Sequence, residues 1–471
     1  MGSSPIPGTK KDQKPKIPLM NISDFKGKRI VVLGVGVEGF SSAEFLKEKG
    51  ADVTILDESP KPDEGLVAKA KDLNITCKFG SDAFGDFSPY DIIVRSPGIR
   101  LSHAALNSLP REKITSQTKL FFDLCPCSII GVTGTKGKGT TASLIFEMLK
   151  AAGKDTYLGG NIGTPPLEFL NNLTKDSWVV LELSSFQLQD IHKSPHIAIL
   201  LMVTSEHLDY HSDTYEYVDA KRNILRFQTQ QDFAVINRDY LASHESDMYT
   251  DAQVFQVSRE LGVADRGCFI KDSAVWIQKD GREKKVIDTK DILLPGRHNL
   301  ENVCAAAMAA FLADVPIKDI KQVLHTFSGL PHRLELVREV NGVRYYDDSF
   351  STTPETAIAA IEAFDASEIL ILGGSSKGAD FSTLGEAINK AKNIKAIVGV
   401  GTEWPKIKAA ITNQAILLIE GAKDMKTIVA AASKIVQPGN VVLLSPACAS
   451  FDMFKNYKDR GEQFKVEVSK L

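Results

Sequence analysis

Two adjoining stretches decide what can be expected of this chain: Ser128-Ile-Ile-Gly-Val-Thr133 and Gly134-Thr-Lys-Gly-Lys-Gly-Thr-Thr141. The first is an apolar run that predicts a buried strand, and the second is a glycine-rich loop that leads into a helical pattern. Consecutive backbone N–H groups in such a loop form an anion-binding nest, and the helix N-terminus adds partial positive charge. Lys138 can bridge terminal phosphates, and the hydroxyl of Thr140 or Thr141 can reach Mg²⁺. The pattern favours triphosphate binding over a plain glycine-rich turn.

Two further strand-turn-helix starts lie on either side of this loop. Arg29-Ile-Val-Val-Leu33 precedes Gly34-Val-Gly-Val-Glu-Gly39, and Glu368-Ile-Leu-Ile-Leu372 precedes Gly373-Gly374. Apolar runs alternate with helical patterns throughout, which predicts parallel α/β architecture. Each start opens a separate unit, so three domains are expected.

The domain boundaries are predicted near Leu120–Pro126 and near Phe327–Pro331. These divide the chain into domains over residues 21–122, 123–328 and 329–471. Residues 1–20 are rich in Lys, Pro, Gly and Ser, and we expect a flexible tail there.

The composition excludes several classes of protein. Of the 471 residues, 43% are hydrophobic and 24% are charged, as in ordinary soluble globular proteins. The net charge of -3 offers no basic excess for binding nucleic acid. No apolar run approaches the roughly 20 residues that a membrane-spanning helix needs. The 6 cysteines are scattered without metal-ligand spacing, which favours free thiols in a reducing cytosol. We expect a cytoplasmic protein that binds neither nucleic acid nor membrane.

The first glycine loop has the spacing of a dinucleotide fingerprint. Gly34, Gly36 and Gly39 lie between a predicted strand and a helix, and Asp57 closes the next predicted strand. NAD or FAD, another nucleotide and a plain tight turn all remain open from this pattern. Ser96-Pro97-Gly98 is a second strand-end turn that could line the same crevice or be a simple turn.

Polar residues follow two apolar runs in the middle of the chain. Trp178-Val-Val-Leu-Glu182 places a carboxylate at the end of a predicted strand, where parallel sheets bind ligands and where Mg²⁺ finds oxygen donors. Thr204-Ser-Glu-His-Leu-Asp-Tyr-His211 follows the next apolar run. Metal binding, substrate binding and a polar surface turn are all compatible with this cluster. Lys221 lies on a helical stretch, where a lone lysine is usually a solvated charge.

Several motifs, taken together and in this order, resemble the Mur ligase family, and the resemblance extends from Arg29 to Phe464. Two of the segments, Leu181–Leu188 and Leu444–Asp452, point to the member that adds D-glutamate. The segments that carry the resemblance are Gly134–Thr141, Gly159–Pro165, Leu181–Leu188, Glu206–Asp209, Lys221, Gly296–Asn302, Leu330–Glu335, Asp347–Ser349 and Leu444–Asp452.

The resemblance implies an α/β protein of three domains. A Rossmann-like N-terminal domain would bind the UDP moiety of the substrate, which argues against NAD at Gly34–Gly39. A central P-loop ATPase domain with a parallel sheet would follow, and a Rossmann-like C-terminal domain would bring the amino acid. The implied activity is ATP-dependent ligation of D-glutamate to UDP-N-acetylmuramoyl-L-alanine through an acyl phosphate, in peptidoglycan precursor synthesis. We expect small-molecule substrates and a monomer.

The resemblance also assigns residues to ATP and to two Mg²⁺ ions. Lys138, His207, Lys221 and Asp348 would be catalytic, and Lys221 matches a lysine that carries a CO₂-derived carbamate. Such a carbamate would turn a cation into an anion able to bind Mg²⁺. The metal ligands would be Thr140, Glu182, His207 and Lys221. The ATP-binding residues would be Gly134, Thr135, Lys136, Gly137, Lys138, Gly139, Thr140, Thr141, Asn299, Asn302, Arg333 and Asp348.

The other two substrates receive their own sets of residues. The UDP-substrate would be bound by Gly34, Gly36, Val37, Glu38, Gly39, Asp57, Ser96, Pro97, Gly98 and Asn161. D-Glutamate would be bound by Lys377, Ser450, Phe451 and Tyr457.

Two departures from the family pattern bear on the alternatives. Gly139 follows the loop lysine where Ser or Thr is usual, which resembles folylpolyglutamate synthase, another ATP-dependent amide ligase. Phe350 stands where a lysine is common, so a phosphate contact is either missing or supplied elsewhere. An NAD-dependent oxidoreductase would use Gly34–Gly39 but leaves Gly134–Thr141 without a purpose.

Overall fold

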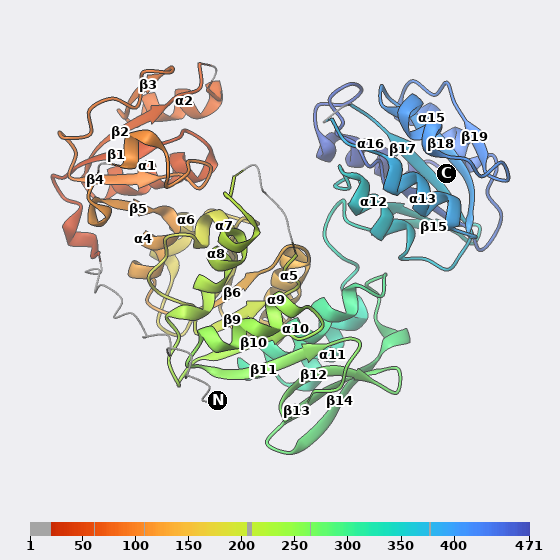
Figure 1. Ribbon diagram of the computed structural model, residues 1–471, viewed down its shortest axis with the longest axis horizontal. Helices are drawn as coiled ribbons and strands as arrows, with labels where there is room; N and C mark the ends of the chain where they lie inside the picture. Colours follow the sequence, from red (N-terminus) through yellow and green to blue (C-terminus); the bar gives the residue numbers. More distant parts are fainter. Residues whose placement is uncertain (1–19, 61, 108, 205–209, 264, 376–377) are drawn as a thin grey trace, which may run out of the picture.

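The protein consists of three lobes, each built around its own sheet (Figure 1). The computed structural model describes residues 20–60, 62–107, 109–204, 210–263, 265–375 and 378–471. In Figure 1 the N-terminal and C-terminal lobes stand apart, and the central lobe joins them from below. None of the helices in these ranges has both the length and the apolar character needed to cross a bilayer.

The N-terminal lobe is a doubly wound parallel sheet. Its 5 strands run in the order β3-β2-β1-β4-β5, and all neighbours are parallel. The order reverses beside β1, so the loop after β1 lies at the switch point where such sheets bind ligands. The elements are β1 Arg29–Leu33, α1 Val37–Glu48, β2 Asp52–Asp57, α2 Glu64–Asp72, β3 Thr76–Phe79, β4 Ile92–Arg95, α3 Ala104–Asn107, β5 Ile114–Ser116 and α4 Gln117–Leu124.

The central lobe has a 9-stranded sheet in the order β14-β13-β12-β11-β10-β9-β6-β8-β7. The strands from β7 to β12 are parallel as predicted, and β13 and β14 extend the sheet as an antiparallel hairpin. The strands are β6 Ser128–Thr133, β7 Thr156–Gly160, β8 Trp178–Glu182, β9 Ile197–Leu200, β10 Phe233–Asn237, β11 Gln253–Ser258, β12 Gly267–Lys271, β13 Ala274–Lys279 and β14 Arg282–Asp288. The helices are α5 Lys138–Ala151, α6 Pro166–Phe169, α7 Ser185–Leu188, α8 Thr214–Arg226, α9 Leu241–His244, α10 Asn299–Leu312 and α11 Ile317–Thr326.

Small residues let helix α10 pack closely in this lobe. The run Cys304–Ala310 is completely buried beside the apolar face of α5 and the strands. Alanine adds almost no bulk, so the backbones of the two helices can approach each other. This packing carries Asn299 and Asn302, at the start of α10, toward the loop that precedes α5.

The C-terminal lobe has a 6-stranded sheet in the order β15-β16-β20-β17-β18-β19, in which only β15 runs antiparallel to its neighbour. Its central strands β17 and β20 are buried along their whole length and, apart from Glu368, carry no charged residue, because helices cover both faces. The elements are β15 Glu335–Val340, β16 Val343–Asp347, α12 Pro354–Ile361, β17 Glu368–Gly373, α13 Ser382–Lys390, β18 Ile394–Val400, α14 Trp404–Ala410, β19 Leu417–Ile419, α15 Met425–Ser433, β20 Val441–Leu444 and α16 Tyr457–Ser469.

Candidate active site

The loop between β6 and α5 forms the predicted nest at the carboxyl edge of the central sheet. Gly137 caps α5 in the left-handed conformation with φ +84°, which favours glycine. The Thr135 N–H donates to the Met202 carbonyl at 2.7 Å and ties the loop to the segment after β9. Lys138 Nζ donates to the Thr135 carbonyl at 3.0 Å, so its ammonium lies over the nest. The loop therefore concentrates N–H groups and a positive charge at one point.

Glu182 and Asn161 lie together beside this loop. Asn161 Nδ2 donates to Glu182 Oε1 at 2.9 Å, and the Asn161 N–H donates to the Glu182 carbonyl at 2.9 Å. A Cβ at Gly139 would lie 3.0 Å from Glu182 Oε2. Glycine at this position lets α5 start directly against the carboxylate, which gives the departure at Gly139 a physical reason.

The two hydroxyls that could reach Mg²⁺ differ in their surroundings. Thr141 is completely buried, and its hydroxyl donates to Asn302 Oδ1 at 3.4 Å. Thr140 makes no such bond to α10 and lies one position nearer the loop. Together with Glu182, Thr140 supplies the hard oxygen donors that Mg²⁺ prefers.

The start of α10 packs against the nest. A Cβ at Gly137 would lie 2.1 Å from Asn302 Oδ1, so the asparagine is in close contact with the loop. Asn302 Nδ2 donates to Asn299 Oδ1 at 2.9 Å, and Asn299 Nδ2 donates to the Pro295 carbonyl at 2.6 Å. Asn299 and Asn302, both predicted to bind ATP, are thus held in a chain of hydrogen bonds.

Lys221 is buried rather than solvated. Only 2% of the residue is exposed, and its Nζ donates to the Gly134 carbonyl at 2.9 Å. The ammonium also lies 4.6 Å from the ring centroid of Tyr217, whose hydroxyl shares a hydrogen bond of 3.0 Å with Thr135 Oγ1. Helix α8 therefore brings Lys221 to the floor of the nest.

The polar cluster after β9 is described only in part. His207 lies outside the described residues, as does Lys377 in the C-terminal lobe. His211 is buried, and its Nε2 lies 3.0 Å from Ser185 Oγ, in the segment that follows Glu182. The structure therefore brings the end of this cluster to the strand that carries Glu182.

Arg333 reaches the nest from the segment that connects the central and C-terminal lobes. Its guanidinium carbon lies 3.8 Å from the ring centroid of Phe350, and the Glu182 carboxylate is close enough to act on it electrostatically. The Phe350 ring packs edge-on against Tyr457 with centroids 5.1 Å apart. The aromatic residue that replaces the expected lysine thus holds an arginine at the site.

Asp348 is buried behind Arg333. Ser445 Oγ donates to Asp348 Oδ2 at 2.8 Å, and the Leu334 N–H donates to Oδ1 at 3.1 Å. Burial raises the pKa of the Asp348 carboxyl to about 7, although these two hydrogen bonds lower it in part. The carboxyl can therefore exchange a proton near neutral pH.

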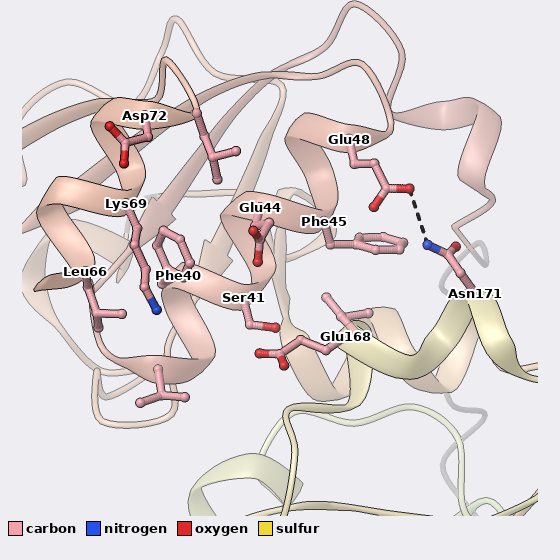
Figure 2. Close-up of a pocket in the computed structure, with 13 residues that line it drawn as sticks. Phe40, Ser41, Glu44, Phe45, Glu48, Leu66, Lys69, Asp72, Glu168 and Asn171 are labelled. Carbon is pink, nitrogen blue, oxygen red and sulfur yellow. Dashed lines mark hydrogen bonds between the residues drawn. The ribbon is translucent and has the colours of Figure 1, made fainter.

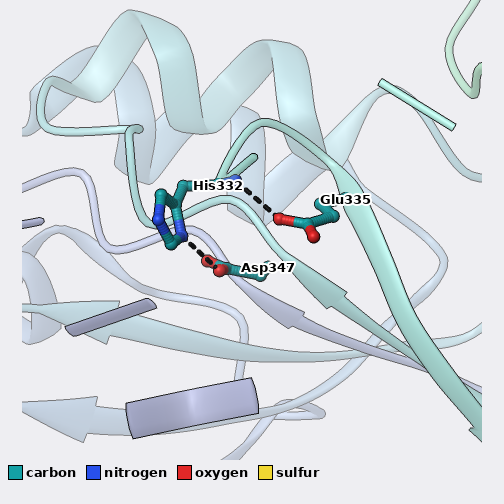
Figure 3. Close-up of side chains that lie close together, drawn as sticks. All are labelled: His332, Glu335 and Asp347. Carbon is teal, nitrogen blue, oxygen red and sulfur yellow. Dashed lines mark hydrogen bonds and ion pairs between the residues drawn. The ribbon is translucent and has the colours of Figure 1, made fainter. Parts of the chain in front are cut away.

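A neighbouring group of ligand-type side chains is an anchor for this connecting segment rather than a metal centre. Figure 3 shows His332 bonded to both Glu335 and Asp347. His332 Nδ1 lies 2.7 Å from Asp347 Oδ2. The His332 N–H donates to Glu335 Oε2 at 2.8 Å, and Lys465 Nζ lies 2.7 Å from the same oxygen. The Lys465 ammonium already neutralises the Glu335 carboxylate, so a bound metal ion would gain little electrostatic stabilisation there. The group instead fixes His332, next to Arg333, on the C-terminal lobe.

The first glycine loop is held tightly by its own lobe. Asp57 Oδ2 accepts the Val35 N–H at 2.8 Å, and Oδ1 accepts the Ser59 N–H at 2.8 Å. A Cβ at Gly39 would lie 1.9 Å from the Gly34 carbonyl oxygen, so only glycine allows α1 to begin there. Ser96 Oγ donates to the same carbonyl at 3.4 Å. Asp57, which was predicted to bind the UDP-substrate, therefore shapes the loop.

Glu38 and the Pro97-Gly98 turn face the central lobe. Gln187 Nε2 donates to Glu38 Oε1 at 2.7 Å, while Glu38 Oε2 is buried with no hydrogen-bond partner among the described residues. Burial raises the pKa of the Glu38 carboxyl to about 7, and the Gln187 hydrogen bond offsets part of this shift. Tyr210 OH donates to the Pro97 carbonyl at 3.0 Å. Both predicted UDP-substrate segments thus lie at the seam between two lobes.

Three of the predicted D-glutamate residues, Ser450, Phe451 and Tyr457, lie within the described ranges, after β20 and at the start of α16. Ser450 is buried, whereas Phe451 is 72% exposed and its N–H donates to Ser375 Oγ at 3.1 Å. The Tyr457 carbonyl accepts a hydrogen bond from Ser349 Oγ at 2.7 Å.

Two buried arginines escaped the sequence analysis. Arg460 Nε donates to Ser349 Oγ at 2.9 Å and a second nitrogen to the Cys448 carbonyl at 3.2 Å, which joins α16 to the loops around Ser450. Arg95 donates to the Ile99 carbonyl at 2.7 Å and lies 3.2 Å from Asp190 in the central lobe. Arg95 is the last residue of the otherwise apolar strand β4, and Arg460 lies in the strongly charged helix α16. A charged residue at the end of an apolar strand was the available signal for Arg95, and Arg460 had none.

Three protein-family models match this chain, one in each lobe. The Mur ligase MurD-like N-terminal domain matches residues 28–116, the Mur ligase middle domain matches 132–310, and the glutamate ligase domain matches 332–448. A UDP-N-acetylmuramoylalanine–D-glutamate ligase of Symbiobacterium thermophilum is 37% identical over 450 residues, which cover 94% of this chain and 98% of the relative. The chain belongs to the Mur ligase family. A ligase of the same name from Clostridium kluyveri is 38% identical over 466 residues, covering 96% of this Mur ligase and 99% of the relative.

A solved structure agrees with the fold of this Mur ligase. The MurF ligase of Thermotoga maritima, solved in complex with ADP, matches with a TM-score of 0.57 and 19% identity. The match covers 96% of this chain and 97% of that one. The predicted three-domain α/β class is therefore confirmed over the part of the chain that this match covers.

Proposed function

We propose that this Mur ligase joins D-glutamate to UDP-N-acetylmuramoyl-L-alanine at the expense of ATP, in peptidoglycan precursor synthesis in the cytoplasm. The observation that carries the proposal is the convergence of Lys138, Glu182, Lys221 and Arg333 on one anion-binding nest. The near-full-length relatives named as D-glutamate ligases support the choice of amino acid. The nucleotide and sugar-nucleotide substrates are cytoplasmic compounds, and all the residues needed come from one chain, so a monomer suffices.

The chemistry requires an anion-rich site. A carboxylate is a poor acyl donor, and transfer of a phosphoryl group from ATP converts it into an acyl phosphate with a good leaving group. The carboxylate and the triphosphate repel each other as they approach. The nest N–H groups, Lys138 and Arg333 would offset this repulsion and align the reacting groups. Mg²⁺ held by Thr140 and Glu182 would supply further positive charge to the triphosphate.

The D-glutamate amine must lose a proton when it attacks the acyl phosphate. Asp348 is the described residue best suited to accept it, because burial holds its pKa near 7. Ser450, Phe451 and Tyr457, on the same lobe, would bind the amino acid. The N-terminal and C-terminal lobes stand apart (Figure 1), so the acceptor and the donor meet when the lobes approach.

The position of Lys221 suits a carbamate that binds a metal ion. It lies on the floor of the nest, and a carbamate there would add an oxygen ligand next to the triphosphate. We assign Lys221 and His207 to the second Mg²⁺ site.

The test is phosphate release from ATP in the presence of UDP-N-acetylmuramoyl-L-alanine, with and without D-glutamate and with L-glutamate as control. Release that requires both substrates, together with a product heavier by one glutamyl unit, is expected. Release with another amino acid instead would place the chain elsewhere in the family. Activity with a folate and L-glutamate would show that the N-terminal lobe binds a different substrate.

The stack of Phe350 on Arg333 is expected to increase kcat/KM for ATP. Replacing Phe350 with leucine removes the cation–π contact, and we expect kcat/KM for ATP to fall roughly 3- to 30-fold, the equivalent of about 0.5–2 kcal/mol. Phe350→Tyr keeps the aromatic face and should stay close to the wild type. Steady-state phosphate release decides the matter, and a leucine variant with unchanged ATP kinetics would contradict the role.

The charge on Glu38 should make binding of the UDP-substrate depend on pH. Glu38 lies within the glycine loop Gly34–Gly39, and its carboxyl becomes an anion as pH rises through about 7. A diphosphate at the loop is then repelled, so KM for the UDP-substrate should increase from about pH 6 to about pH 9 by roughly tenfold. Glu38→Gln should abolish this increase, while KM for ATP serves as the internal control. A variant with the same pH profile as the wild type would show that Glu38 does not face the diphosphate.

A further inference from the structure

A cavity of about 790 Å³ lies between the N-terminal and central lobes, and of its lining residues only Val37 was assigned to a substrate above. Helix α1 forms one wall, with α2 beside it, and α6 with the turn that follows it forms the other (Figure 2). We name it the α1–α6 groove. Its lining includes Phe40, Ser41, Glu44, Phe45, Asp72 and Glu168.

The groove has an apolar floor. Its open apolar surface comes from Val37, Leu66 and Leu73, whereas Phe40, Phe45 and Leu167 are almost completely buried, with exposed fractions of 8%, 4% and 1%. Aliphatic surfaces of this kind accept methylene groups and release water. A ligand with an aliphatic body would therefore bind there.

The rim of the groove is acidic. Its lining includes the carboxylates of Glu44, Glu48, Asp72 and Glu168 and only one cation, Lys69. Glu48 is already bound by Lys49 Nζ at 2.9 Å and by Asn171 Nδ2 at 3.3 Å. The other three carboxylates make no ion pair within the ranges that the structure describes. The rim thus offers unneutralised negative charge to a cationic ligand.

Ser41 provides a second, independent sign of a ligand. Only 2% of the residue is exposed, yet its hydroxyl has no hydrogen-bond partner among the described residues. Figure 2 shows this hydroxyl directed into the groove toward Glu168. Buried hydroxyls are nearly always hydrogen-bonded, so a ligand N–H would satisfy an otherwise unpaired group.

The arrangement of the charges selects the kind of cation. Among the described residues, the carboxylates of the rim do not converge within the distance that a metal ion requires, because only His332, Glu335 and Asp347 do so. The three carboxylates without an ion pair, Glu44, Asp72 and Glu168, come from three different helices, α1, α2 and α6. A chain of ammonium groups separated by methylene groups can reach several such separate charges. Distributed charge above an apolar floor fits an extended polycation.

We propose that the α1–α6 groove binds a linear aliphatic polyamine. The methylene chain lies on Leu66 and Leu73, and the ammonium groups donate to Glu44, Glu168 and Asp72. Ser41 Oγ accepts an N–H from the ligand. Because the walls belong to two lobes, the bound polyamine joins the N-terminal lobe to the central lobe. The site is independent of the ligase activity proposed above.

The test is calorimetric titration of the full chain with spermidine, without ATP, because ATP itself binds polyamines. Saturable binding of about one equivalent is expected. The double variant Glu44→Gln/Glu168→Gln should weaken the Kd by roughly tenfold or more, and Ser41→Ala by roughly two- to fivefold. The matched control is Glu355→Gln/Glu386→Gln, which removes the same charge from exposed positions of the C-terminal lobe. Its Kd should equal that of the wild type.

Three results would overturn the proposal. Absence of saturable binding would show that the groove does not take polyamines. An equal loss in the two double variants would reduce the effect to general attraction by negative charge. A monoamine of similar length that binds as tightly as spermidine would leave only the apolar floor as a binding surface.

Discussion

Replacing Lys138 with alanine is expected to abolish phosphoryl transfer, with a loss in kcat of roughly a thousandfold or more, about 4 kcal/mol of transition-state stabilisation. Lys138 Nζ lies over the nest, bound to the Thr135 carbonyl at 3.0 Å, where the terminal phosphates would be held. The developing charge on the transferred group loses its nearest fixed cation in the variant. Detection of the acyl phosphate by trapping with hydroxylamine, beside phosphate release, measures this step directly.

The matched control is Lys150→Ala, which removes an exposed lysine from the last turn of the same helix. Its activity and unfolding temperature should equal those of the wild type. Normal acyl-phosphate formation in Lys138→Ala would refute the assignment. A general loss of stability in Lys138→Ala would show that the effect arises from the fold of the loop rather than from the missing charge.

Replacing Lys221 with alanine should also cost roughly a thousandfold in kcat if the side chain acts as a carbamate. The variant loses the proposed oxygen ligand and leaves a space on the floor of the nest. Short carboxylates such as formate or acetate can enter this space and replace the carbamate oxygens. We therefore expect added carboxylate to restore part of the activity in a saturable manner, measured by phosphate release.

Two comparisons separate the carbamate from a purely structural role. Acetate should not stimulate the wild type or Lys138→Ala, because neither lacks the carbamate oxygens. If Lys221 only clamps the loop through the Gly134 carbonyl, Lys221→Gln should retain much of the activity because it keeps a donor. Absence of rescue at every carboxylate concentration, together with an active glutamine variant, would count against the carbamate.

The sequence was sufficient wherever the signal is local. The strands β1, β6 and β8 begin and end at the predicted residues, because the middle of a strand buried on both faces must be apolar. The glycine loops after β1 and β6 were recognised from their spacing, since only glycine permits the turns at Gly39 and Gly137. The order of motifs along the chain indicated the family, which the near-full-length relatives confirm.

Tertiary structure alone decided which side chains meet. Lys221 reaches the Gly134 carbonyl across 87 positions of sequence, and Gln187 reaches Glu38 across 149. No local pattern distinguishes such a lysine from a solvated one, because burial depends on where α8 packs. The stack of Phe350 on Arg333 likewise requires the connecting segment to fold back onto β16. Phe350 stands where a lysine was expected, and its ring instead holds the guanidinium of Arg333. Sequence periodicity determines which faces are apolar, but the charges and hydrogen bonds of the site depend on contacts that exist only after the lobes have formed.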